Sequence, residues 1–211
     1  SLAKQIISDE SIDPVKTVYA QRFFNNLSGE TGQVKVLVIE NSKTNAFAMP
    51  GGHIVVFKPI IEMSESYEEF AGLMAHENAH LVHRHSLRAL FRNLSGYLFM
   101  SVLFSDVNGI MAVVAENAHS LKSLQFTREL EKEADLTGLD MLVDRGVDPD
   151  GMVRLFAALK KESGNNFFPE FLSTHPMLDE RITYLKEEIA TRNLSAQPTD
   201  SLQYYWQKLK E

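Results

Sequence analysis

The chain of 211 residues contains no cysteine. Disulfide bonds, thiolate metal sites and a cysteine nucleophile are therefore excluded, although the absence of cysteine does not identify the redox compartment. The chain also lacks an excess of basic residues. Its net charge of −7 argues against nucleic acid or an anionic membrane as the main partner. Hydrophobic residues make up 44% of the sequence and charged residues 23%, which is the usual balance for a globular protein with a buried core.

Two features that would indicate export or membrane insertion are also weak. The sequence starts at Ser1 without a basic region followed by an apolar run, so no signal peptide is visible. Residues 93–115 carry no charge except Asp106. A spanning helix needs about 20 mostly apolar residues, and an aspartate near its centre costs about 2.5 kcal/mol or more. We therefore expect two shorter buried segments, 97–104 and 110–115, in preference to a membrane span.

The hydrophobic periodicity predicts an α+β fold, mostly helical, with one small β-sheet in the N-terminal half. Residues 33–40 (QVKVLVIE) and 53–58 (HIVVFK) are predicted strands, because they alternate or are rich in valine and isoleucine. A short segment, 44–50, lies between them and ends in a Pro-Gly-Gly turn. Helices are predicted at 11–29, 67–90, 128–144, from 149 to 164, and after Pro176.

Capping residues support the boundaries of two of these helices. Ser66 and Glu69 have the spacing of a capping box before the helix at 67–90. Thr127 is suited to be the N-cap of the helix at 128–144. We predict one domain over residues 1–190 and a tail over 191–211, which contains a short docking helix around 202–206.

The motif His76-Glu77-Asn78-Ala79-His80 is typical of zinc peptidases. Four residues advance a helix by about 400°, so His76 and His80 lie one turn apart on one face and both imidazoles can bind one ion. Glu77 lies about 100° away around the helix and can reach a water molecule at that ion. Chance occurrence of the pattern is the alternative, but the predicted helix and its cap favour a zinc site.

The third ligand is not expected on the same helix, because one helix cannot wrap three of its own side chains around a tetrahedral ion. His83 lies beyond His80 and is predicted to be a surface residue or a supporting one. His85 lies on the opposite face from His76 in a continuous helix, and is a poorer candidate still. Metzincins would have glycine and histidine at the positions of His83 and Ser86, so that class is excluded. His53 and His119 are interpreted as ordinary histidines.

A better third ligand lies on the helix at 128–144. Glu131 and Asp135 are four residues apart and share a helix face. Glu131 would complete a His₂Glu site with an open position, and Asp135 would accept the spare N–H of a ligating histidine. The alternative is an ordinary charged helix face, which is our interpretation of Glu129 and Glu133. Glu133 lies about 200° around the helix from Glu131 and is predicted to point away.

Four segments in order resemble the M48 peptidases, a family of zinc metallopeptidases that includes the CAAX prenyl proteases. The resemblance extends from about residue 33 to 190. The segments are 45–52 (NAFAMPGG), 76–80 (HENAH), 131–135 (EKEAD), and 173–176 (STHP) with 180–181 (ER). The sequence departs from the family pattern at two places. Residues 58–61 (KPII) stand where the family often has Gly-Leu, and Asn78 is an unusual polar residue within the motif. Neither touches a metal ligand, so the departures concern substrate fit and not catalysis. The chain also lacks the membrane spans of the integral members, which weakens any transfer of prenyl-protein substrates.

The resemblance implies a gluzincin fold in which the edge strand of a small sheet aligns a peptide substrate. It also implies that Glu131 is the ligand and not Glu133. Asn45 and His175 are implied to help at the reacting carbonyl. Alternatively, His175 has no catalytic role and is a helix cap or a packed loop residue, because it lies just before Pro176 at the start of a helix. If it is functional, His175 either donates a hydrogen bond to the oxyanion or binds the open metal position in a resting form.

We therefore predict a metalloendopeptidase that carries one Zn²⁺ per chain and hydrolyses extended or unfolded polypeptides, with Glu77 as general base. Substrate would be bound as an added strand at the sheet edge. No nucleic acid partner is expected, peripheral membrane association is allowed, and the oligomeric state is left open. The resemblance to exported relatives favours the bacterial cell envelope or periplasm. Two alternatives are a non-catalytic zinc-stabilised binding module and a chaperone-like adaptor with vestigial motifs.

Overall fold

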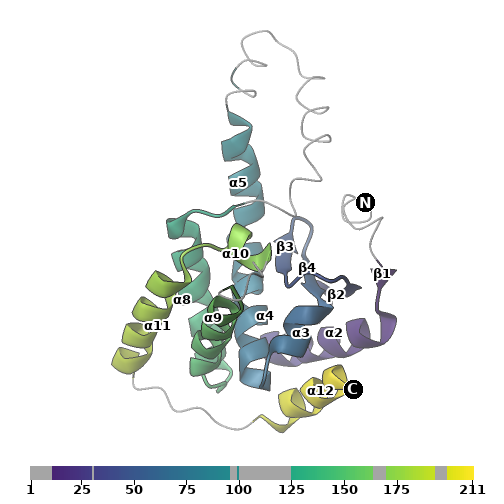
Figure 1. Cartoon of the computed structure of the whole chain (residues 1–211). Coiled ribbons are helices and arrows are strands. Elements are labelled where there is room, and N and C mark those ends of the chain that lie inside the picture. The colour runs from purple at the N-terminus through teal and green to yellow at the C-terminus, as the bar shows by residue number, and fades with distance from the viewer. Residues whose placement is uncertain (1–10, 30, 96–98, 100–124, 164–169, 193–198) are drawn as a thin grey trace.

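The computed structural model describes residues 11–29, 31–95, 99, 125–163, 170–192 and 199–211 (Figure 1). The predicted buried segments 97–104 and 110–115, and His119, lie outside the described residues apart from Phe99. Among the described helices, none combines the length and the apolar character that a membrane crossing requires. The predicted α+β class with one small sheet is confirmed.

The sheet has four strands in the order β1-β2-β4-β3. The two predicted strands are β2 (Lys35–Glu40) and β4 (His53–Phe57), which pair in parallel. Between them in sequence, β3 (Ala46–Met49) pairs antiparallel with β4 and occupies the edge. The turn from β3 to β4 depends on Gly51 and Gly52, which have φ angles of 93° and 77°.

The first predicted helix, 11–29, begins later than expected. Residues Ser11–Ile12 form strand β1, which pairs antiparallel with β2, and the helix α2 starts at Pro14 and ends at Ser28. Asp13 is the N-cap, because its side chain accepts a hydrogen bond from the Lys16 amide at 2.9 Å. The physical reason is the pairing of β1 with the sheet, which local periodicity does not reveal.

Helix α4 (Tyr67–Val82) lies at the centre of the molecule. Figure 1 shows it between the sheet and the helices α8 (Arg128–Asp144), α9 (Asp150–Ser163) and α11 (Leu178–Arg192), and it packs against α8, α9 and β3. Ser66 caps its N-terminus as predicted, since Ser66 Oγ accepts from the Glu69 amide, but the Glu69 carboxylate accepts from the Glu65 amide and not from that of Ser66. The remaining described helices are α3 (Lys58–Met63), α5 (His85–Asn93), α10 (Glu170–Thr174) and α12 (Asp200–Lys210).

The predicted single helix over 67–90 is wrong, because the chain bends between α4 and α5. Arg84 stands in the left-handed region with φ 55°, which ends α4 at Val82 and starts α5 at His85. A second non-glycine residue in this region, Met177 with φ 71°, separates α10 from α11. Such a conformation costs a non-glycine residue about 1 kcal/mol or more and is found where the surrounding structure enforces it. Both bends lie close to the histidines described below.

The C-terminal helix α12 packs against α2 and α4. Trp206 lies against Phe70 of α4, with ring centroids 5.6 Å apart, and Lys210 Nζ donates to the carbonyls of Ile61, Glu62 and Ser64. The lysine thus satisfies carbonyl groups at the end of α3 that the helix itself leaves unpaired. The division of the chain into a domain over 1–190 and a tail stays a prediction.

Candidate metal centre

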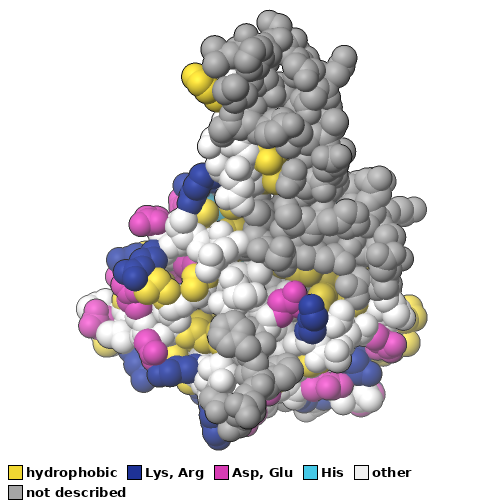
Figure 2. Space-filling view, turned by 45° about the horizontal axis from the view of Figure 1, so that its top comes forward, with side chains coloured by type: hydrophobic (Ala, Val, Ile, Leu, Met, Phe, Trp, Pro, Cys, Tyr) yellow, Lys and Arg dark blue, Asp and Glu magenta, His cyan; other side chains and the backbone are white. Residues whose placement is uncertain are grey.

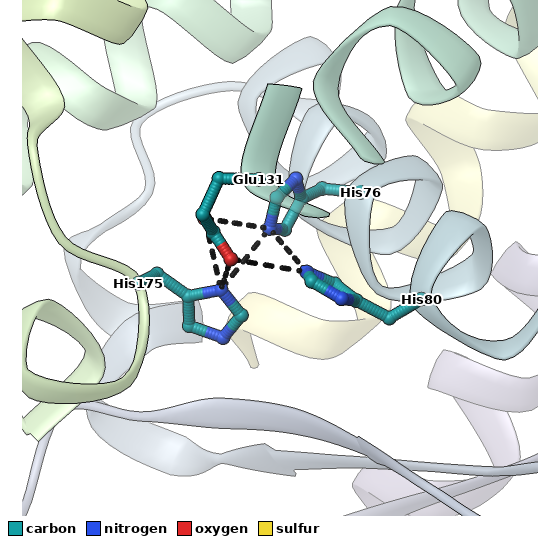
Figure 3. Close-up of side chains that lie close together, drawn as sticks. All are labelled: His76, His80, Glu131 and His175. Carbon is teal, nitrogen blue, oxygen red and sulfur yellow. Dashed lines mark hydrogen bonds and ion pairs between the residues drawn. The ribbon is translucent and has the colours of Figure 1, made fainter. Parts of the chain in front are cut away.

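Four buried side chains from three parts of the chain converge on one point. His76 and His80 come from α4, Glu131 from α8, and His175 from the segment that follows α10 (Figure 3). Each offers one nitrogen or oxygen atom, and these atoms lie within 4.8 Å of one another. All four residues are at most 1% exposed. The structure therefore brings together the three predicted ligands and adds His175 to them.

The spacing of the four donor atoms suits a single tetrahedral ion. His76 Nε2 lies 3.0 Å from His80 Nε2 and 3.2 Å from His175 Nδ1. Glu131 Oε1 lies 3.1 Å from His175 Nδ1 and 3.5 Å from His80 Nε2. Ligands at about 2.0–2.1 Å from a tetrahedral ion are about 3.4 Å apart, so these separations fit. Three imidazole nitrogens and one carboxylate oxygen are also ligands that zinc accepts.

A close approach of α8 to α4 lets Glu131 and Asp135 reach the histidines. At Gly138 on α8, an added Cβ would lie 3.1 Å from the backbone nitrogen of His76. A larger residue would require the neighbouring atoms to shift by a few tenths of an ångström. Glycine at this position thus serves helix packing, which outweighs its cost of about 1 kcal/mol in a helix interior.

Glu77 lies beside the four donors and is fully buried. Its Oε1 is 3.6 Å from His175 Nε2, and among the described residues neither carboxylate oxygen has a hydrogen-bond partner. Burial, together with the nearby Glu131 carboxylate, raises the pKa of the Glu77 carboxyl well above its usual value. A buried carboxyl without a protein partner is suited to bind and deprotonate a small polar molecule such as water.

Asp135 is in contact with His76, as predicted. Its Oδ1 lies 2.9 Å from His76 Nδ1, the nitrogen that faces away from the other donors. Burial alone would raise the pKa of the Asp135 carboxyl, but the Arg181 guanidinium and the His76 hydrogen bond hold it well below its usual range. An ionised Asp135 accepts the Nδ1 proton of His76 and leaves Nε2 unprotonated for a metal.

Arg181 of α11 forms a buried ion pair with both carboxylates. Its Nε and Nη2 donate to the two oxygens of Asp135 at 2.8 and 2.7 Å, and its Nη1 lies 2.5 Å from Glu131 Oε2. Its guanidinium also lies over the Phe156 ring at 4.2 Å. Glu131 Oε2 thus contacts the guanidinium and also lies 3.3 Å from His175 Nδ1, whereas Oε1 is nearer to His80 and His175. Burial raises the pKa of Glu131 to about 7, against the opposing effect of Arg181.

The sequence interpretation missed the contributions of Arg181 and Tyr184. Arg181 was part of the family resemblance but was given no role, and Tyr184 was not singled out. Tyr184 OH donates to Asp135 Oδ2, so it holds the same carboxylate from another side. Both lie on one face of α11, at i and i+3, which was the only available signal.

Neither His85 nor Glu133 is one of the four donors. The expected position of His85 on the opposite face of one continuous helix is wrong, because α4 ends before it. His85 is fully buried, and its Nδ1 lies 2.9 Å from His80 Nδ1. Its Nε2 lies 3.0 Å from Glu133 Oε2, which also accepts from Arg88 Nη1 at 2.7 Å. Hydrogen bonds from Arg88 and His85 lower the pKa of Glu133 to about 2. The bend at Arg84 is the physical reason, because it turns His85 back towards α4. His83 also contacts Glu133, with 3.4 Å between Nδ1 and Oε1, in keeping with a supporting position.

Asn45 is buried at the start of β3. Its Oδ1 accepts a hydrogen bond from the Ala46 amide at 2.9 Å, and its carbonyl accepts from the Phe57 amide. These contacts fix the edge strand, and the described contacts of the Asn45 side chain do not join it to the four donors. Its participation at the reacting carbonyl stays a prediction.

Replacement of Asp135 by asparagine is expected to weaken zinc affinity about 10–100-fold. The amide keeps the shape of the side chain but loses the charge that holds His76 Nδ1–H and Arg181. Competition with a chromophoric chelator measures the change. Asp140→Asn is the matched control, because Asp140 lies on the same helix with its carboxylate towards solvent. Equal zinc affinity for Asp135→Asn and wild type would remove Asp135 from the site.

Comparison with known proteins agrees with this geometry. The model of the family described as peptidase family M48 matches residues 18–189. The chain belongs to peptidase family M48. The match covers most of the chain and includes all four donor residues, so the resemblance inferred from the motifs is confirmed. A family of metallopeptidases is also consistent with a buried group that is suited to hold a metal.

Two kinds of named relatives are similar to this M48 chain. The mitochondrial metalloendopeptidase OMA1 of Schizosaccharomyces pombe is 29% identical over 201 residues, which cover 92% of this chain and 59% of the relative. A putative beta-barrel assembly-enhancing protease of Vibrio cholerae is 31% identical over 191 residues, which cover 83% of this chain and 39% of the relative. The chain therefore spans about three fifths or less of the length of these relatives.

Proposed function

We propose that this M48 chain is a zinc metalloendopeptidase that hydrolyses peptide bonds in extended or unfolded polypeptides. The observation that carries the proposal is the buried set of His76, His80, Glu131 and His175 with Glu77 beside it. The set alone would suit a structural metal site, which is normally four-coordinate. Glu77 favours catalysis, because burying a carboxylate without a hydrogen-bond partner costs free energy and a structural metal site does not require it.

In the proposed mechanism, His76, His80 and Glu131 would hold one zinc ion. That ion would act as a Lewis acid on the substrate carbonyl and would lower the pKa of water to about 7. Glu77 accepts one proton from the water whose oxygen attacks the carbonyl carbon. Glu77 then gives this proton to the leaving nitrogen as the C–N bond breaks, so the products are an acid and an amine. A raised pKa of Glu77 suits a group that must accept and return a proton.

The two alternative roles of His175 are supported to different extents. An oxyanion donor would lie near the reacting carbonyl, whereas a resting fourth ligand would place a nitrogen among the metal ligands. The separations of 3.1 and 3.2 Å from His175 Nδ1 to Glu131 Oε1 and His76 Nε2 favour the fourth-ligand role in the conformation described. Movement of His175 would then open the position that the substrate carbonyl needs.

His175→Ala distinguishes these roles by the sign of its effect. A resting ligand predicts retained zinc and unchanged or higher kcat/KM, because the fourth position is then free. An oxyanion donor predicts retained zinc and a kcat lower by about 10²–10³-fold. Zinc content and kcat/KM on one peptide are measured beside His53→Ala, since His53 is the first residue of β4 and is not among the four donors. The structure predicts the first result, and a large loss of kcat with full zinc would contradict it.

Substrate is proposed to bind along β3, the edge strand of the sheet. In the register with β4, Asn45 accepts from the Phe57 amide, so the backbone groups of Ala46 and Ala48 point away from β4. One of them, the Ala48 carbonyl, already accepts a hydrogen bond from Ser86 Oγ of α5 at 2.7 Å, so substrate would displace Ser86 there or use the other groups. An added peptide strand would bind through its backbone, which favours extended segments over a particular sequence.

Surface charge bears on the partners that we propose for this chain. In Figure 2 the acidic and basic side chains of the described surface are interspersed on the face shown, which supports the proposal that nucleic acid is not a partner. The bacterial cell envelope or periplasm is the proposed compartment. One relative is named for beta-barrel assembly and the other as mitochondrial, and neither name is transferred to this chain.

The function is tested by digestion of an unfolded polypeptide such as casein. The zinc-loaded protein is expected to cleave it, to lose activity after treatment with a chelator, and to regain activity when zinc is restored. A folded protein of similar size serves as the second substrate and is expected to resist. Zinc binding without cleavage of any unfolded substrate would favour the alternative of a zinc-stabilised or chaperone-like binding module.

A further inference from the structure

The two histidines of the metal-binding motif are supported differently at their outer nitrogens. His76 Nδ1 faces a carboxylate, with Asp135 Oδ1 at 2.9 Å. Among the described residues, His80 Nδ1 meets no carboxylate and instead faces His85 Nδ1, also at 2.9 Å. His85 in turn contacts Glu133, with 3.0 Å between Nε2 and Oε2. His80 thus reaches a carboxylate through a second imidazole.

We propose that His85, supported by Glu133, positions the His80 ring for metal binding, as Asp135 positions the ring of His76. The proposal rests on the metal centre proposed above and adds two residues to it. His85 is a positioning residue, since it contacts His80 but is not itself one of the four donors. A series of contacts then runs from the ion to the surface through His80, His85, Glu133 and Arg88.

The hydrogen-bond geometry defines one tautomer for each ring. A neutral His80 that binds through Nε2 carries its proton on Nδ1. His85 Nδ1 must then accept that proton, so the proton of His85 is on Nε2. His85 Nε2–H points at Glu133, whose carboxylate accepts it together with the Arg88 guanidinium. Each contact in this series has one donor and one acceptor, so the hydrogen bonds of both rings are satisfied without any further group.

The backbone and the ring packing hold this arrangement in place. Arg84, with φ 55°, turns the chain so that His85 begins α5 with its ring directed back to His80. On the other side Phe126 stacks on the His80 ring, with centroids 4.2 Å apart and planes at 28°. His85 is fully buried, so its ring is not free to turn to solvent. The ring of His80 is therefore fixed by stacking and by a directional hydrogen bond.

The same residues also form a second group that is spaced for a metal ion. His83, His85 and Glu133 offer donor atoms within 4.8 Å of one another. An ion there would take Nε2 of His85 and move its proton to Nδ1, where it would oppose the Nδ1 proton of His80. Arg88 Nη1 also lies 2.7 Å from Glu133 Oε2, which places a positive charge beside the site. We infer that His85 serves His80 and that this group does not bind a second ion alongside the first.

Zinc affinity of His85 variants tests the proposal. His85→Leu removes the acceptor and is expected to weaken zinc binding about 10–100-fold in a chelator competition. His85→Asn places an amide oxygen near the position of Nδ1 and is expected to restore part of that loss. The visible absorption spectrum of the cobalt-substituted protein is expected to change in His85→Leu, because the His80 ring is no longer fixed. Glu133→Ala is expected to weaken affinity less than His85→Leu does.

His83→Ala is the matched control. His83 stacks on His85, with ring centroids 5.4 Å apart, and contacts Glu133 and Thr137, but its described contacts do not include His80. Loss of its ring leaves the His85 acceptor in place, so His83→Ala is expected to lose clearly less zinc affinity than His85→Leu. Melting temperatures of the metal-free variants separate a positioning effect from unfolding. The partial rescue by asparagine does the same, because a purely steric role would not favour a side chain with an acceptor.

Three results would overturn the proposal. They are wild-type zinc affinity in His85→Leu, equal losses in His85→Leu and His83→Ala, and two tightly bound zinc ions per wild-type chain. If the wild-type chain bound no zinc at all, the metal centre itself would be wrong. If wild type bound one zinc and His85→Leu bound it equally well, only the role of His85 would be wrong.

Discussion

Replacement of Glu77 by glutamine is expected to lower kcat by about 10²–10⁴-fold while zinc stays bound. Glutamine keeps the volume of the side chain but cannot accept a proton from the attacking water. Neither Glu77 oxygen has a partner at normal hydrogen-bond geometry among the described residues, and the Ala48 backbone, which lowers the pKa of Glu77, can also donate to the amide oxygen of glutamine. Because burial disfavours the charged carboxylate, the neutral amide is expected to leave the melting temperature unchanged or higher.

The measurement is kcat on a quenched fluorescent peptide, with zinc content determined on the same sample. Glu129→Gln is the matched control, since Glu129 is a solvent-exposed glutamate on α8. The control is expected to retain wild-type kcat. A Glu77→Gln variant with kcat within a few-fold of wild type at neutral pH would show that another group takes the proton.

Replacement of Glu131 is expected to abolish zinc binding at stoichiometric metal. The carboxylate supplies the one oxygen among the four donors and contributes the negative charge that faces them. Glu131→Ala also leaves the Arg181 guanidinium with a single carboxylate partner. Breaking a buried ion pair in this way costs about 3–5 kcal/mol, so the alanine variant is expected to melt at a lower temperature.

Glu131→Gln separates metal loss from destabilisation, because the amide oxygen remains an acceptor for Arg181 but is a poor zinc ligand. Glu133→Ala is the comparison on the same helix, and it is expected to hold one zinc at saturating metal. Zinc content by elemental analysis after gel filtration decides the outcome. Full zinc in both Glu131 variants together with loss in Glu133→Ala would place the ligand at position 133.

The parts of the site that depend on local spacing could be predicted from the sequence. His76 and His80 are four residues apart within one helix, and so are Glu131 and Asp135, so the helical repeat alone brings each pair to one face. The strands β2 and β4 were also evident, because buried parallel strands are rich in valine and isoleucine. The family resemblance was needed to add His175, which reaches the donors from a different part of the chain.

The parts that depend on tertiary context could not be predicted. Nothing in the sequence around Arg84 indicates a helix end, since neither glycine nor proline is present there and a left-handed arginine is uncommon. An uninterrupted helix would place His85 on the face opposite His76. The contacts of His85 with His80 and Glu133 could therefore not be predicted. The burial of Arg181 could not be predicted from its spacing to Tyr184, because a single arginine in an amphipathic helix is usually exposed, whereas here two buried carboxylates bind it.

X-ray absorption at the zinc edge of the zinc-loaded protein identifies the atoms that bind the metal. A metal held by His76, His80, Glu131 and His175 predicts about four nitrogen or oxygen neighbours at about 2.0–2.1 Å, with the outer-shell scattering of imidazole rings. In His175→Ala the imidazole contribution is expected to fall by about one ring while the zinc remains. A shell of about six oxygen atoms without imidazole scattering, unchanged in His76→Ala, would show that the zinc is held elsewhere and would contradict the account.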